Sequence, residues 1–593
     1  MKKKKNYFIH LFLVLILIVI SITGCSGKKA NMEIPDSATG TNVSGGQANS
    51  VNTVLSESQV QNQVMDSSAV RDKADSNTGI AGTDGIAVEE DKVQVDEYGM
   101  GTLLDKENNG LGNYNTEEYK AIVENDFVSV LNNPLSTFSV DVDTASYSNI
   151  RRMIYENQPV EPDAVRLEEM INYFKYDYKE PESGNPFSVN TELSDCPWNE
   201  NAKLLLIGLK AKDIDRKECP SSNIVFLLDV SGSMDEANKL PLMQKAFVML
   251  TENLNENDRI SIVTYAGEER VVLEGARGDE TMKISSAIED LTAGGSTAGS
   301  AGIEKAYELA EAYYIKGGNN RVILATDGDL NVGITSEGAL TRLIEEKREN
   351  GVFLSVLGFG TENIKDNKME ALADNGNGNY SYIDSLLEAK KVLVEEMGGT
   401  LFTVAKDVKL QVEFNPEQIK GYRLIGYENR LLNTEDFEDD TKDAGEIGAG
   451  HRVTALYELL TADSRQDIPE TELKYQTKEQ LPGFANSKEW LTINIRYKDP
   501  DKNKSKLMSV SVDAGIYTKS MPDNLTFASS VASFGMLLRD SKWKGTSSYD
   551  MILDNLSRIN TERDEYKDEF VSLVKKMERF NPDYMHPNVD GIE

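Results

Sequence analysis

The pattern of apolar and polar residues between positions 223 and 397 predicts alternating strands and helices. Short continuous apolar runs occupy 223–228, 259–264, 321–325 and 352–358. Such runs are typical of strands that are buried on both faces. Between them, apolar residues recur every three to four positions in 303–314 and 340–344, which is the period of an amphipathic helix. The alternation predicts an α/β domain with a doubly wound parallel sheet, whose ligands bind beyond the carboxyl ends of the strands.

On both sides of this domain the pattern changes to strict alternation of apolar and polar residues. Phe138, Val140 and Val142 alternate with polar residues, and the same period of two recurs in 408–414, 491–497 and 508–512. This period is typical of half-buried strands in an antiparallel sheet or sandwich. Because such strands come before and after the α/β domain, we predict that the domain is inserted into a β-sandwich-like flank. Helical stripes in 531–538, 552–559 and 566–580 predict a helical C-terminal region.

The first 25 residues have the pattern of a secretory signal. Four lysines at 2–5 precede an apolar run at 11–20, and small residues lead to Cys25. The tetrapeptide at 22–25, Ile-Thr-Gly-Cys, resembles the bacterial lipobox, in which the cysteine is lipidated and becomes the mature N-terminus. An uncleaved membrane anchor is the alternative, but the apolar run is short for a span of about 20 residues. We therefore expect a lipid-anchored protein on the extracytoplasmic side of the cell membrane.

Composition narrows the classes of function. The chain has 593 residues with 63 Lys and Arg against 98 Asp and Glu, a net charge of −35, which argues against a nucleic-acid partner. Its only histidines are His10, His451 and His586, which excludes His-rich zinc sites and leaves little room for a Ser-His-Asp hydrolase. Beyond Cys25 there are two cysteines, Cys196 and Cys219, which outside the cytoplasm could form a disulfide or remain buried thiols.

Polar residues gather where the predicted strands end. Asp229, Ser231 and Ser233 follow the first strand in the sequence DVSGS, Thr297 lies in the Gly-rich loop TAGGSTAGSAG, and Asp327 follows a later strand in LATDGD. Two carboxylates and three hydroxyls form an all-oxygen set that suits Mg²⁺ or Mn²⁺. Because Mg²⁺ takes six ligands, a carboxylate from a partner is a natural sixth.

Two alternatives to this metal site come from the same residues. Ser296 could take the place of Thr297, and DVSGS could be an ordinary strand-to-helix turn with a capping serine. The recurrence of polar residues at three strand ends favours the metal site. A further segment, 141–146, faintly resembles an aspartic-protease motif or a second metal loop. We interpret it as a strand-to-helix turn, because no partner copy is found.

The order and spacing of these five residues resemble the metal-ion-dependent adhesion site of von Willebrand factor type A domains. In the flanks, FSVDVDTASYSNIRRMI, DAVRLEEMINYF, YRLIGYENR and AGEIGAGHRVTALYEL are similar to the bacterial YfbK-like family of A-domain lipoproteins, over about residues 120–590. The resemblance implies a bound Mg²⁺ or Mn²⁺ and a protein partner that presents a carboxylate. It implies no enzymatic activity.

We therefore expect six regions along the chain. They are a lipoprotein signal peptide (1–25), a disordered tether (26–118), an N-terminal flanking β-rich region (119–221), a von Willebrand factor type A domain (222–397), a C-terminal β-rich region (398–520) and a helical C-terminal region (521–593). The tether is expected because residues 26–97 contain no aromatic residue and cannot bury enough apolar surface to fold.

Three functions are compatible with these features. The leading hypothesis is a membrane-tethered binding protein that captures an acidic side chain of a protein partner through the metal. The alternatives are a metal-dependent hydrolase, for which His451 is the only plausible histidine base, and an envelope assembly factor or sensor. A lone histidine outside the α/β domain is more simply a loop or strand-start residue, so we expect a binding module rather than an enzyme.

Overall fold

The computed structural model describes residues 117–580, apart from gaps at 141–142, 215–219, 267, 296–301, 329–336, 362–363, 397–401, 443, 469–487 and 501. These residues belong to one compact unit, Asn108–Glu593. None of the helices in the described part combines the length and hydrophobicity needed to cross a bilayer.

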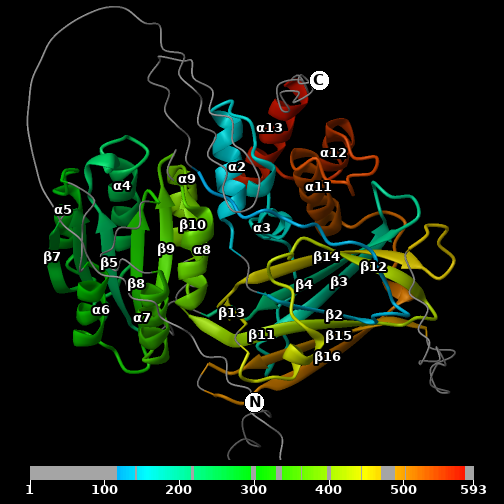
Figure 1. Cartoon of the computed structure of the whole chain (residues 1–593), viewed down its shortest axis with the longest axis horizontal. Helices are drawn as coiled ribbons and strands as arrows, with labels where there is room; N and C mark the ends of the chain where they lie inside the picture. Colours follow the sequence, from blue (N-terminus) through cyan, green and yellow to red (C-terminus); the bar gives the residue numbers. More distant parts are fainter. Residues whose placement is uncertain are drawn as a thin grey trace, which may run out of the picture. The chain divides into compact units, whose positions relative to one another are not determined.

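The α/β domain is built on a six-stranded sheet (Figure 1). In sheet order the strands are β10 (Tyr380–Ile383), β9 (Val352–Phe359), β8 (Asn319–Thr326), β5 (Ser222–Asp229), β6 (Arg259–Ala266) and β7 (Glu268–Arg277). All neighbours are parallel except β6 and β7. The four predicted strands are confirmed, and β7 and β10 extend the sheet at its two edges.

Helices cover both faces of this sheet because successive strand residues point to opposite sides. On one face Phe226 and Leu228 pack into a core with Phe247 of α4, and on the other Val225 and Leu227 pack into a core with the residues of α6. The helices of the domain are α4 (Leu240–Thr251), α5 (Thr281–Glu289), α6 (Gly302–Ala312), α7 (Glu337–Glu349), α8 (Asp366–Asn375), α9 (Leu386–Lys390) and the π-turn η3 (Lys391–Glu395). The doubly wound fold class is therefore confirmed.

Strands from both flanks of the α/β domain form a β-sandwich. One sheet has the order β1 (Val128–Ser129), β12 (Ile419–Ile425), β14 (Arg452–Thr461), β4 (Lys203–Ala211), β3 (Phe187–Asp195). The other has the order β13 (Gly445–Gly448), β11 (Thr403–Phe414), β15 (Glu489–Lys498), β16 (Lys506–Asp513), with β2 (Leu135–Ser139) paired to β11. Since β4 and β11 lie on either side of the α/β domain in sequence, the domain is inserted into the sandwich as predicted.

A layer of helices packs on the outer face of the first sheet. Leu205 and Ile207 of β4 point into the sandwich core, whereas Leu204 and Leu206 point into the helical layer. The layer contains α2 (Ala145–Tyr155), α3 (Leu167–Asn172), α11 (Asp523–Leu538), α12 (Tyr549–Leu556) and α13 (Glu565–Arg579). The N-terminal flank thus supplies two helices in addition to its strands, and the C-terminal helical region is confirmed. Figure 1 shows α2 (cyan) beside α13 (red).

A buried arginine connects this helical layer to the end of the α/β domain. Arg151 of α2 is 1% exposed, and its guanidinium contacts Asp384, Glu388 of α9 and Glu569 of α13. The contacts to Glu388 and Glu569 are both 2.8 Å long, and the Tyr173 hydroxyl accepts a further hydrogen bond at 2.9 Å. One buried charged side chain therefore joins α2, α9 and α13, which links the helical layer to the C-terminal helix of the α/β domain.

Candidate metal centre

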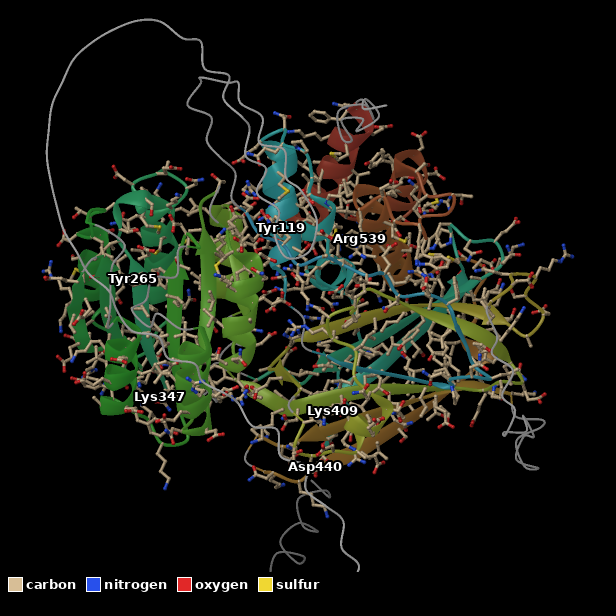
Figure 2. All side chains as sticks on the ribbon, in the orientation of Figure 1. Tyr119, Tyr265, Lys347, Lys409, Asp440 and Arg539 are labelled. Atoms are coloured by element: carbon tan, nitrogen blue, oxygen red, sulfur yellow. The ribbon has the colours of Figure 1, made fainter. Side chains whose placement is uncertain are left out.

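Asp229 stands at the carboxyl end of β5, in the middle of the six-stranded sheet. It pairs in register with Tyr265 of β6, whose position in the sheet is labelled in Figure 2. The Asp229 side chain is fully buried, and one of its oxygens accepts the backbone N–H of Ser231 at 2.9 Å. Burial raises the pKa of Asp229 to about 6, and the negative charge of Asp327 acts in the same direction, against the hydrogen bond from Ser231.

The loop after β5 presents two hydroxyls beside this carboxylate. The Ser231 and Ser233 hydroxyl oxygens lie 3.0 Å apart and share a hydrogen bond. Ser231 is fully buried and Ser233 is exposed, while Met234 is buried and anchors the following turn in the core. The loop therefore runs from the protein interior to the surface, and its oxygens line that path.

Asp327 directly follows β8, the strand that lies next to β5. It is fully buried, and one carboxylate oxygen accepts a hydrogen bond from the Lys239 ammonium at 3.2 Å. Thr326 beside it donates a long hydrogen bond of 3.5 Å to Asp229 and accepts the backbone N–H of Gly328. The carboxylates of Asp229 and Asp327 are thus brought to the same edge of the sheet, as the sequence predicts for parallel strands.

The Gly-rich loop that precedes α6 begins at this same edge. The Gly294 N–H donates to the Val230 carbonyl at 2.9 Å, and the Gly232 N–H donates to the Gly295 carbonyl at 3.3 Å. Gly295 has a φ of +89°, and a Cβ there would lie 2.9 Å from the Ala266 carbonyl oxygen, so this turn requires glycine. Thr297 and its alternative Ser296 lie outside the described residues.

The donor chemistry of the described residues fits a hard divalent cation. Two buried carboxylates and two hydroxyls converge, and the negative charge of Asp327 is close enough to raise the pKa of Asp229. Carboxylate and hydroxyl oxygens are the ligands that Mg²⁺ and Mn²⁺ prefer. Sequence reasoning identified these groups but missed Thr326 and Lys239. A threonine inside a strand and a lysine before a helix carry no distinctive signal.

His451 lies far from these residues. It lines a cavity of about 260 Å³ together with Arg321 and Asn379. Arg321 comes six residues before Asp327 along β8, which corresponds to about 20 Å at about 3.3 Å per residue. Burial lowers the pKa of His451. The structure therefore does not bring His451 and the candidate metal centre together.

The remaining predicted sites concern cysteines. Cys196 carries a free thiol that is buried against Glu458, with the sulfur 3.6 Å from a carboxylate oxygen. Cys219 and the lipidation residue Cys25 lie outside the described residues. For Cys196 the structure shows the buried thiol, which is the second of the two predicted states, and not the disulfide. The lipid anchor stays a prediction.

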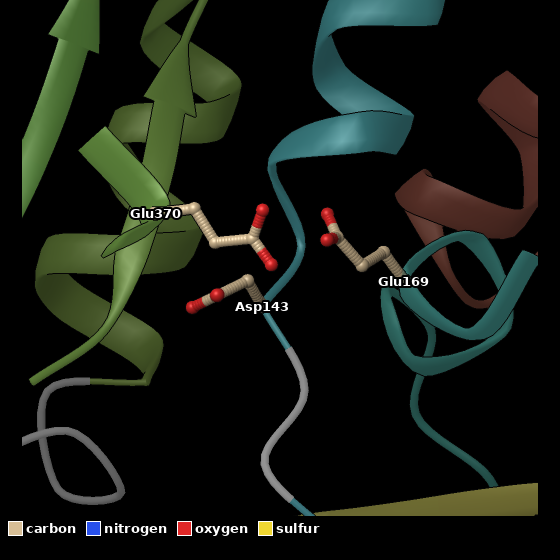
Figure 3. A group of neighbouring side chains, drawn as sticks. All are labelled: Asp143, Glu169 and Glu370. Carbon is tan, nitrogen blue, oxygen red and sulfur yellow. The ribbon is translucent and has the colours of Figure 1, made fainter. Parts of the chain in front are cut away.

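Figure 3 shows a second group of carboxylates, and arginines hold this group in place. Asp143 follows β2, Glu169 belongs to α3 and Glu370 to α8, and an oxygen of each lies within 4.8 Å of the others. Arg430 donates to Asp143 and Glu370 at 3.1 Å each, and Arg166 contacts Glu169. The cluster is therefore an ion network. Asp143 and Thr144 lie between β2 and α2, and residues 141–142 of the predicted strand-to-helix turn lie outside the described residues.

Glu169 of this network makes stability depend on pH. Burial raises its pKa from the ordinary 4.5 to about 7, outweighing Arg166, and the charge of Glu370 adds to the rise. The pKa of Glu169 is higher in the folded chain than in the unfolded chain, so protonation of Glu169 stabilises the fold. This stabilisation is complete below about pH 4.5 and is lost as the pH rises through about 7. We expect the free energy of unfolding to fall over this window by at most about 3 kcal/mol.

Urea unfolding at several pH values between 4.5 and 8 measures this effect. The difference between the wild-type chain and Glu169→Gln isolates it from other groups, because glutamine does not titrate. A difference that stays constant across the window would show that Glu169 is ionised throughout.

Comparisons with known proteins agree with this architecture. The family profile described as "von Willebrand factor type A domain" matches residues 223–395, and one described as "von Willebrand factor" matches 113–206. The profile "Uncharacterized protein YfbK, C-terminal" matches 399–580. The uncharacterized protein YfbK of Escherichia coli strain K12 is 42% identical over 473 residues, which cover 78% of this chain and 82% of that protein. The chain belongs to the YfbK family.

Other proteins are similar to this YfbK-family protein over part of its length. An uncharacterized protein of Synechocystis is 30% identical over 320 residues, covering 53% of the chain and 70% of that protein. Among solved structures, a von Willebrand factor type A protein from Catenulispora acidiphila is similar, with 14% sequence identity and a TM-score of 0.37. The similar region covers 68% of this chain and 91% of that protein's chain. Type A domains are typically protein-interaction or adhesion modules and often bind a divalent metal, which indicates a function of that general kind.

Proposed function

We propose that this YfbK-family protein is a lipid-anchored binding protein on the extracytoplasmic side of the cell membrane. Its type A domain captures an acidic side chain of a protein partner through a bound Mg²⁺ or Mn²⁺. The observation that carries the proposal is the convergence of the buried Asp229 and Asp327 with a path of hydroxyls to the surface. Lys239 pairs with one of these two carboxylates, and the negative charge that remains buried is costly unless a further cation compensates it.

Each residue of the site has a distinct part in this proposal. Asp229 and Asp327 supply the negative charge that holds the ion, and Ser231, Ser233 and Thr297 supply neutral oxygens. When bound, the ion supplies an electron-poor centre that accepts a carboxylate oxygen of the partner. Ser233 is exposed, so the partner approaches from its side of the loop.

The anchor and the tether complete the proposed function. Lipid on Cys25 holds the chain at the membrane, and residues 26–118 let the folded part reach about 50 Å from it. A metal-dependent hydrolase is the weaker candidate, because such an enzyme needs a general base near the metal. His451, the histidine proposed for that role, lines a cavity at the opposite end of β8.

Titration of the full-length chain in detergent micelles with Mn²⁺ and Mg²⁺, followed by calorimetry, tests the proposal. We expect the wild-type chain to bind and Asp229→Ala to lose more than about a hundredfold in affinity. Replacing a residue that only contacts a metal ligand typically lowers metal affinity about 10–100-fold, so the loss of a ligand itself is expected to cost more. Asp235→Ala is the matched control, since Asp235 lies exposed in the same loop and should leave binding unchanged.

Two results would overturn the proposal. One is a wild-type chain that binds neither ion, even with a soluble carboxylate such as acetate present. The other is equal metal affinity in the wild-type chain and Asp229→Ala, which would place the bound ion elsewhere.

A further inference from the structure

Lys239 places a buried positive charge on the candidate metal centre. Its ammonium nitrogen lies 3.2 Å from a carboxylate oxygen of Asp327, and the two side chains are 5% and 0% exposed. Among the described residues, the other carboxylate that pairs with the ammonium is Glu236, which is 61% exposed and lies 3.9 Å away. Asp327 is therefore the buried partner of this lysine.

The position of Lys239 is held by the fold. A Cβ built on Gly360, which follows β9 with a φ of +78°, would lie 2.4 Å from Cε and 2.6 Å from Cγ of Lys239. The lysine stem therefore packs directly against Gly360, whose lack of a side chain leaves room for it beside Asp327. The Lys239 residue is also the N-cap of α4, where a cation is unfavourable for the helix. Helix stability therefore does not explain the lysine.

We propose that Lys239 tunes the candidate metal centre, lowering its affinity for the divalent ion and raising the affinity of the loaded site for a carboxylate. This inference rests on the proposed function. Without the ion, the ammonium offsets the charge of Asp327. With the ion, it repels the added positive charge across a short distance.

The charges of the buried groups explain why the two effects have opposite signs. The carboxylates of Asp229 and Asp327 balance the two positive charges of the ion, and Lys239 leaves one positive charge in excess. An excess positive charge attracts an anionic ligand. A site without the lysine would be neutral when loaded, so it would hold the ion more tightly and the carboxylate more weakly.

Lys239→Met removes the charge and keeps an unbranched stem beside Gly360. In full-length protein in detergent, we expect Mn²⁺ affinity to rise about tenfold and the affinity of the Mn²⁺-loaded protein for acetate to fall about tenfold. Calorimetry measures the Mn²⁺ affinity. The acetate affinity is measured by water-proton relaxation: bound Mn²⁺ enhances the relaxation, and acetate that binds to the ion reduces this enhancement. Lys245→Met is the control, because Lys245 is exposed on the same helix and carries the same charge.

The outcomes separate this inference from the proposed function. If the wild-type chain binds no Mn²⁺, or binds it as well as Asp229→Ala does, the proposed function fails and this inference fails with it. If the wild-type chain binds Mn²⁺ and Lys239→Met leaves both affinities unchanged or weakens both, Lys239 has only a structural role and the inference alone is overturned. Lys239→Gln, neutral but shorter, gives the same readout should the methionine variant not fold.

Discussion

Replacing Arg151 by methionine is expected to lower the free energy of unfolding by about 3–5 kcal/mol. The guanidinium is buried among Asp384, Glu388 and Glu569, and Glu388 is itself fully buried. Without the arginine, these carboxylates remain in the interior with less compensating charge. Desolvation of the remaining groups, rather than the loss of the contacts as such, accounts for the size of the effect.

Urea unfolding followed by near-ultraviolet circular dichroism measures this loss. Arg558→Met is the matched control, because Arg558 pairs with Asp554 on the surface, where the side chains are 66% and 68% exposed. Such surface pairs contribute about 0–1 kcal/mol. A loss for Arg151→Met that equals the control value would mean that water reaches the Arg151 network.

Replacing Phe570 by alanine is expected to cost about 3–5 kcal/mol of unfolding free energy. Phe570 of α13 is fully buried, and its ring lies 5.4–5.6 Å from the rings of Phe174, Phe527 and Phe534. Phe527 and Phe534 both belong to α11, whereas Phe174 follows α3, so removal of the central ring leaves a cavity between separate elements. The lost edge contacts between the aromatic rings add to the lost burial.

The same unfolding experiment with Val571→Ala provides the comparison, since Val571 is the next residue on α13 and is only partly buried. We expect that change to cost about 1 kcal/mol. If both variants lost the same amount, the aromatic cluster would not be rigidly packed.

The β7 and β10 strands show where sequence patterns become weak. The register between β6 and β7 shifts twice, so apolar residues of β7 do not keep a period of two. The β10 strand has only four residues. In contrast, β5, β8 and β9 are central strands of the sheet with neighbours on both sides, and their continuous apolar runs identified them.

For this protein, the sequence by itself determined the elements whose pattern is local. The doubly wound domain, its insertion between sandwich strands, the C-terminal helices and the polar residues at the strand ends all follow from hydrophobic period and spacing. Only the tertiary structure decided which charges meet. Lys239 and Asp327 are 88 residues apart, and Arg151 and Glu388 are 237 residues apart. A charged residue gives the same sequence signal on a surface or in an interior, because its partner is selected by packing and burial and not by its neighbours in the chain.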